Sequence, residues 1–84
     1  MSRPMSEVLR VIYCRLELCS SIYQAMDDCQ RYGDITRLER LTADKTVSKW
    51  LGAMNEPTLM NATTKKVAFK KFIQTTHEAE RVII

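Results

Sequence analysis

Glycine and proline are scarce in this 84-residue chain, which contains two of each. Sandwiches and barrels need many turn residues, and linkers are rich in the same two types, so the composition argues against all three. Aromatic residues make up only 7% of the chain. Most of the other apolar positions are Leu, Ile, Val, Met or Ala, which suits helix packing. We therefore expect an all-α protein that forms a single domain over residues 1–84.

Cysteine and histidine are too few for the sites that they usually build. The cysteines are Cys14, Cys19 and Cys29, and the single histidine is His77. An odd count without a C-x-x-C pair suits neither a disulfide framework nor a zinc site, so reduced thiols are expected. Two glycines are also too few for a loop that cradles phosphates. We expect no enzymatic activity, no cofactor and no metal.

Long apolar runs are missing as well. No stretch approaches the ~18 uncharged apolar residues of a membrane-spanning helix. The first 20 residues carry five charged side chains, which interrupt any signal-peptide core. We expect a cytoplasmic protein, in the host cytoplasm if it is viral, without direct membrane insertion.

The charges that are present are unevenly distributed. Residues 1–44 hold six basic and seven acidic side chains, for a net −1, whereas residues 45–84 hold seven and three, for a net +4. A basic face is expected on the last helix, formed by Lys65, Lys66, Lys70 and Lys71. It suits a solvated surface, an acidic protein partner or, less favoured, nucleic acid.

The longest uninterrupted segment predicts a first helix over about residues 4–32. Pro4 fits its first turn and Gly33 fits the position just past its end. Apolar residues recur at helical spacing in two rows on opposite sides of this helix. A helix that is apolar on two sides is normally buried on two sides, against another helix of the chain, a second copy or a partner. The candidate partner-binding residues are Val11, Leu18, Ala25 and Tyr32, together with Ile83 and Ile84 at the apolar end of the chain.

The middle of the chain has a break in its apolar pattern. Asp34 is a candidate N-cap, and Ile35, Leu38 and Leu41 form a short stripe that begins after it. The apolar residues that follow, from Val47 onward, resume in a different phase. The pattern predicts one or more short helices within 35–55, with a kink or break between residues 42 and 44 and a stop at Pro57. A last helix is expected over about residues 61–82, which makes three or four helices in total.

The stretch "TVSKWLGAMNEPTL", residues 46–59, resembles the exit of the recognition helix in phage-type helix-turn-helix repressors. Ser48, Trp50, Pro57 and Leu59 have the family's spacing, while Gly52 comes one residue early. Upstream, Arg37 and Leu41 stand where the family has a small residue and a turn residue. The resemblance implies a DNA-binding transcriptional regulator. The side chains that would face the DNA groove are Thr46, Ser48, Lys49 and Ala53.

A second resemblance concerns overall character. Small size, a helical pattern, reduced thiols and no catalytic group, with the stretches "DITRLERL" and "MNEPTL", are similar to the small regulatory proteins of T-even-like phages. Among these is the accessory antiholin of lysis inhibition. The resemblance implies binding to the cytosolic part of a membrane holin and a delay of host lysis.

The residues thus lead to two functional hypotheses. The first is a non-catalytic helical regulatory or adaptor protein that acts by binding another protein, with a homo-oligomer as a further option. The apolar second side of the first helix motivates it, because a contiguous apolar surface marks an interaction site. The alternative is a helix-turn-helix DNA-binding protein, for which the basic second half of the chain is the motivation.

Overall fold

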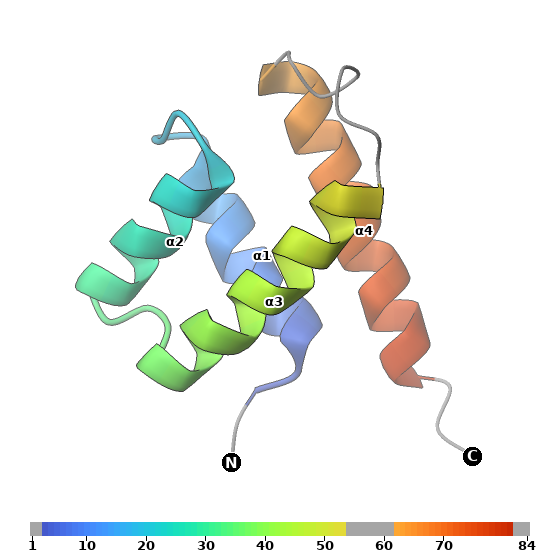
Figure 1. The fold of residues 1–84 in the computed structure, drawn as a ribbon, viewed down its shortest axis with the longest axis horizontal. Helices are drawn as coiled ribbons and strands as arrows, with labels where there is room; N and C mark the ends of the chain where they lie inside the picture. The colour runs from blue at the N-terminus through green and yellow to red at the C-terminus, as the bar shows by residue number, and fades with distance from the viewer. Residues whose placement is uncertain (1–2, 54–61, 82–84) are drawn as a thin grey trace.

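The computed structural model contains four helices in the part of the chain that it describes, as the sequence predicts for an all-α chain (Figure 1). It describes residues 3–53 and 62–81, and in the second range the side chains from residue 66 onward. No strand occurs in these two ranges. The helices are α1 (Met5–Leu16), α2 (Ile22–Arg31), α3 (Arg37–Ala53) and α4 (Ala62–Arg81).

Helix α1 lies at the centre of the fold and contacts the other three helices. In Figure 1, α2 and α4 lie on either side of α1, and α3 crosses in front of it. The core gathers apolar side chains from every helix, as expected for a short chain that can build only one core. Its buried members are Val8, Leu9, Ile12, Leu16, Ile22, Ala25, Met26, Cys29, Ile35, Ala43, Val47, Phe69 and Ile73.

The predicted first helix over residues 4–32 is wrong, because the chain folds back between α1 and α2. The N–H groups of Leu18 and Cys19 bond to carbonyls three residues back, which tightens and ends α1. Ser21 then caps α2, since its hydroxyl oxygen accepts from the N–H of Gln24 at 3.0 Å. Folding back lets α2 bury its apolar side chains against α1, so the two predicted rows become parts of a helical hairpin.

Gly33 ends α2 in a Schellman motif. Its φ of +79° lies in the left-handed region that glycine enters without strain. Its N–H bonds to the carbonyl of Gln30 at 3.2 Å, and the N–H of Asp34 bonds to that of Cys29 at 2.7 Å. This reversal places Ile35 in the core and starts α3 two residues later.

Helix α3 differs from its prediction in two respects. The expected kink or break between residues 42 and 44 is wrong, because α3 is continuous from Arg37 to Ala53. The expected N-cap at Asp34 is also wrong, since the cap is Thr36. The predicted stop at Pro57 lies outside the described residues, and α4 confirms the last predicted helix.

The two glycines make a matched test of this backbone. Gly33→Ala should lower the free energy of unfolding by about 1 kcal/mol, because alanine is strained at positive φ. Gly52→Ala should instead raise it by about 0.5–1 kcal/mol, since Gly52 lies within α3 with open space around the position of a Cβ. Urea denaturation followed by circular dichroism measures both. Shifts of the same sign would contradict the assigned backbone.

Candidate protein-binding surface

Helix α3 turns an unexpected face toward the core. Its buried positions are Glu39, Ala43 and Val47, which are spaced by four residues and lie on one side of the helix. The predicted inward stripe is wrong for Leu38 and Leu41, which are 66% and 53% exposed. The side chains that fix α3 in this orientation therefore decide which of its residues are exposed.

A capping box fixes the start of α3. The N–H of Glu39 donates to the hydroxyl oxygen of Thr36 at 3.1 Å, and the N–H of Thr36 donates to the Glu39 carboxylate at 2.8 Å. These reciprocal bonds satisfy two backbone donors at the helix end. They require the Glu39 side chain to turn back toward the N-terminus of α3.

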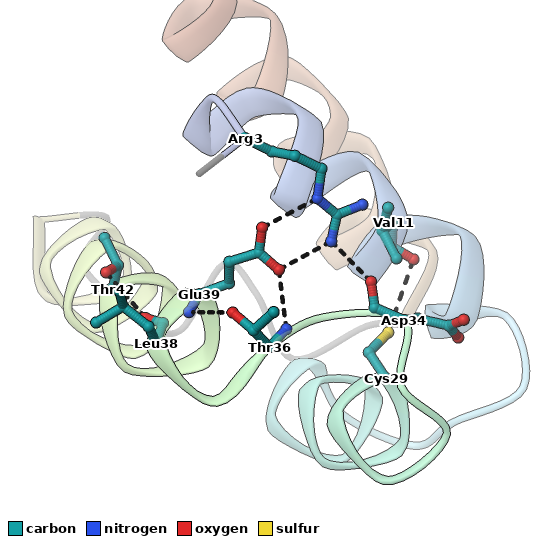
Figure 2. Close-up of polar contacts among 8 residues, drawn as sticks. All are labelled: Arg3, Val11, Cys29, Asp34, Thr36, Leu38, Glu39 and Thr42. Carbon is teal, nitrogen blue, oxygen red and sulfur yellow. Dashed lines mark hydrogen bonds and ion pairs between the residues drawn. The ribbon is translucent and has the colours of Figure 1, made fainter. Parts of the chain in front are cut away.

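Arg3, near the start of the chain, binds the carboxylate of the capping box (Figure 2). Its Nε and Nη2 donate to the two oxygens of the Glu39 carboxylate at 3.0 and 2.9 Å, and Nη2 also donates to the carbonyl of Asp34 at 2.7 Å. This bidentate pair supplies the counter-charge that a buried carboxylate needs. The Arg3 hydrogen bonds, helped by the N–H of Thr36, lower the pKa of Glu39 from 4.5 to about 2.

The middle of α3 is joined to α2 by ion pairs. Arg40 donates from Nη1 to Asp27 at 2.6 Å and from Nε to Asp44, one turn further along α3, at 2.9 Å. The Tyr23 and Ser48 hydroxyls form a further bond between α2 and α3 at 2.8 Å. These contacts lie along the edge of α3 that faces α2.

Aromatic side chains anchor the carboxyl half of α3 to α4. The Trp50 and Phe72 rings stack with centroids 4.9 Å apart and an interplanar angle of 9°. Trp50 also lies 5.6 Å from the buried ring of Phe69. Such pairs contribute about 0.5–1.5 kcal/mol beyond the area that they bury. Trp50 therefore acts as a packing anchor between α3 and α4.

With both ends fixed, α3 presents one face outward. Its exposed residues are Arg37, Leu38, Leu41, Thr42, Lys45, Ser48, Lys49, Gly52 and Ala53. We define the α3 ridge as Leu38, Leu41, Lys45 and Lys49, with Arg37 at one edge. At about 100° per residue these positions span roughly a third of the helix circumference.

The α3 ridge carries cations and no acid. The acidic residues of α3 are Glu39, which is buried, and Asp44, which is half-buried beside Arg40. Lys45 and Lys49 are one turn apart, so their like charges cost about 0.2–0.5 kcal/mol. The hydroxyl of Thr42 donates to the carbonyl of Leu38 at 3.1 Å within the helix, so it needs no outside partner.

The partner-binding residues that the sequence predicts differ in their exposure to solvent. Ala25 is fully buried and Val11 is half-buried against the core, so neither offers a surface to a partner. Leu18 and Tyr32 are 78% and 64% exposed, and the Tyr32 ring lies 5.1 Å from the guanidinium carbon of Arg15. The other two predicted residues, Ile83 and Ile84, lie outside the described residues.

The predicted basic residues of α4 do not form one uniform face. Lys70 and Lys71 are exposed, but as neighbours on a helix they point about 100° apart. Lys66 is half-buried, with its Nζ 3.9 Å from a carboxylate oxygen of Glu17. The side chain of Lys65 lies outside the described residues.

The helix-turn-helix register that residues 46–59 imply does not fit α3. That register requires a turn at Leu41, which lies inside the continuous helix. Of the residues expected to face a DNA groove, Ser48, Lys49 and Ala53 are exposed and Thr46 is half-buried. The hydroxyl of Thr46 donates within α3, to the carbonyl of Thr42 at 3.0 Å.

A cavity of about 610 Å³ lies between the start of α1 and the end of α4. Its lining residues are Pro4, Ser6, Glu7, Arg10, His77, Glu80 and Arg81. Glu80 accepts from the Ser6 hydroxyl and, at 3.0 Å, from the Ser6 N–H, so α4 supplies the cap of α1. These bonds lower the pKa of Glu80. The cavity therefore contains a satisfied structural contact.

The cysteines that have shifted acidities are not activated thiols. Burial raises the pKa of both Cys29 and Cys19, and a bond to Asp28 at 3.2 Å raises that of Cys19 further. Raised thiol pKa values disfavour the nucleophilic thiolate. Among the described residues there is no group of three potential metal ligands, and no helix there is long and apolar enough to span a membrane.

Sequence reasoning therefore missed Leu38 and Leu41 as surface residues. The signal was present, because these two leucines are out of phase with Val47 and Trp50. A straight helix that buries one pair must expose the other. From the sequence alone, the same change of phase predicts a kink or break between residues 42 and 44.

The capping box can be tested by pH. Folding lowers the pKa of Glu39 to about 2, so its contribution to stability is complete above about pH 4.5 and is lost as the pH falls toward 2. Glu39→Gln should lower the free energy of unfolding at pH 7 by about 1 kcal/mol and flatten this acid-side loss. Denaturant titrations between pH 2 and 7 measure both effects.

Glu78→Gln is the matched control, because it removes an exposed carboxylate from α4. It should change the free energy of unfolding by less than about 0.5 kcal/mol. If the acid-side slope of Glu39→Gln equals that of the unaltered chain, Glu39 is not the group that links stability to pH.

Comparison with known proteins adds no relative to this description. No protein-family model matches the chain, and neither a curated protein nor a solved structure matches it significantly. The resemblance to lysis-regulating phage proteins therefore stays a prediction.

Proposed function

We propose that this chain is a small non-catalytic regulatory or adaptor protein that acts by binding another protein through the α3 ridge. The observation that carries the proposal is the exposure of Leu38 and Leu41, side by side on a helix that is held at both ends. Two large apolar side chains at one end of an exposed helix face suit the apolar part of a protein interface.

The surroundings of these leucines support the same function. The backbone beneath them is fixed by the capping box and the Trp50–Phe72 stack, so little ordering cost remains when a partner binds. Polar and charged residues border the leucines, as the polar rim of an interface borders its apolar part. The resemblance to phage regulators extends the proposal to one partner, the cytosolic part of a holin, whose binding would delay host lysis.

Paired substitutions test the proposal. Leu38→Ser with Leu41→Ser should leave the free energy of unfolding within about 0.5 kcal/mol per site, since both side chains are exposed. The same variant should lose at least about 90% of partner recovery, because truncating central apolar contacts costs more than about 1 kcal/mol each. Quantitative affinity capture from cells that express the tagged chain measures this recovery.

Leu18→Ser is the control, because Leu18 is also an exposed leucine but lies in the turn between α1 and α2. A protein that the unaltered chain and Leu18→Ser both recover, and that the double variant loses, supports the α3 ridge. If only Leu18→Ser fails to recover the partner protein, the interface lies at the turn between α1 and α2 instead. Equal recovery by all three proteins would overturn the proposal.

DNA binding is the second candidate, because the α3 ridge and its edge carry Arg37, Lys45 and Lys49 without an acid. It requires a salt-dependent affinity for duplex DNA that weakens when Lys49 is replaced by Ala. The leucines weigh against it, since they occupy the positions where a DNA-reading helix would place polar side chains.

A further inference from the structure

We propose that the partner of the α3 ridge is an acidic amphipathic helix, with apolar residues near one end of its contact face and carboxylates near the other. This inference rests on the proposed function and adds the chemistry of the partner. It follows from the order of side chains along α3, from the signs of their charges and from the continuity of the helix.

The shape of the α3 ridge favours a helical partner. Leu38, Leu41 and Lys45 are spaced by three and four residues, so they form the kind of continuous ridge that packs into the groove of another helix. From Leu38 to Lys49 the ridge extends about 16 Å at 1.5 Å per residue, or about three turns. A partner helix of similar length would cover all of it.

The charges of the α3 ridge select an acidic partner. Lys45 and Lys49 follow the two leucines, and Arg37 lies at the other edge. The neighbouring acids are engaged elsewhere: Asp44 and Asp27 bind Arg40, and Glu39 binds Arg3. Carboxylates one turn apart on a partner helix would meet both lysines and remove their mutual repulsion.

The same charges disfavour a second copy of the chain. A two-fold interface pairs the same patch of both protomers, so a parallel dimer across the α3 ridge would face cations with cations, and an antiparallel one would set Lys45 and Lys49 against leucines; neither offers the lysines a carboxylate. Juxtaposed like charges weaken association. The occupant is therefore a different surface, one that carries the opposite charge.

A displayed library of helical peptides tests the proposal directly. The library carries randomised residues on one face of a fixed helical template. It is selected on the unaltered chain and counter-selected on the variant with Leu38→Ser and Leu41→Ser. Enriched peptides should carry more Asp and Glu than Lys and Arg, with their apolar residues about two turns from the acids.

Charge-reversal substitutions then measure the electrostatic contribution to peptide binding. Lys45→Glu with Lys49→Glu should weaken binding of the enriched peptides at least about ten-fold at low ionic strength, and added salt should reduce this factor. Lys70→Glu with Lys71→Glu is the matched control, because it makes the same change in net charge on exposed residues of α4. This control should change the affinity less than about two-fold.

Each other outcome overturns a defined part of the proposal. Enriched peptides that are neutral or basic, or that bind the Lys45 and Lys49 variant as tightly as the unaltered chain, would overturn the acidic partner and leave the proposed function standing. If no peptide distinguishes the unaltered chain from the leucine variant, both proposals fail. Tight binding of a 20-base-pair duplex that depends on the lysines and is indifferent to the leucines would assign the ridge to nucleic acid.

Discussion

The arrangement of this molecule depends on the inward orientation of Glu39. A carboxylate is costly to bury, and here the Arg3 guanidinium and the capping box with Thr36 offset that cost. Once Glu39 points inward, the helix period also brings Ala43 and Val47 to the core. The same geometry turns Leu38 and Leu41 outward. The bonds among Arg3, Thr36 and Glu39 thus fix which face of α3 is core and which is surface.

The alternative orientation of α3 shows why this one is favoured. A rotation of α3 by about 100° around its own axis would bury Leu38. The transfer of this side chain out of water would contribute about 1.5–3 kcal/mol to stability. It would also pull Val47 out of the core and separate Trp50 from Phe72. Val47 and the aromatic stack together outweigh one leucine, and the loss of the Glu39 bonds adds to the difference.

Local sequence signals predicted the helical class and the last helix, because these depend on residues near one another. The absence of glycine and proline and the helical spacing of apolar residues are enough to predict α4. The break between α1 and α2 was missed because Ser20 and Ser21 are weaker signals than glycine or proline, and Ser21 acts only through its bond to Gln24. Two opposite apolar rows describe a two-sided helix and a folded hairpin equally well.

The candidate site could not be predicted in the same way, because its cause is distant in the sequence. Arg3 is separated from Glu39 by 36 residues, and Trp50 meets Phe72 in a different helix. A phase conflict between Leu41 and Val47 is visible in the sequence, but whether a helix breaks or exposes one pair is decided by such distant contacts. Helix α3 resolves the conflict by staying straight. The fold cannot bury the two leucines without exposing Val47 and separating Trp50 from Phe72, so only a bound partner would remove them from water. The cations beside them then restrict which partner can do so, because a surface of the same sign would lose in repulsion what it gains by covering the leucines.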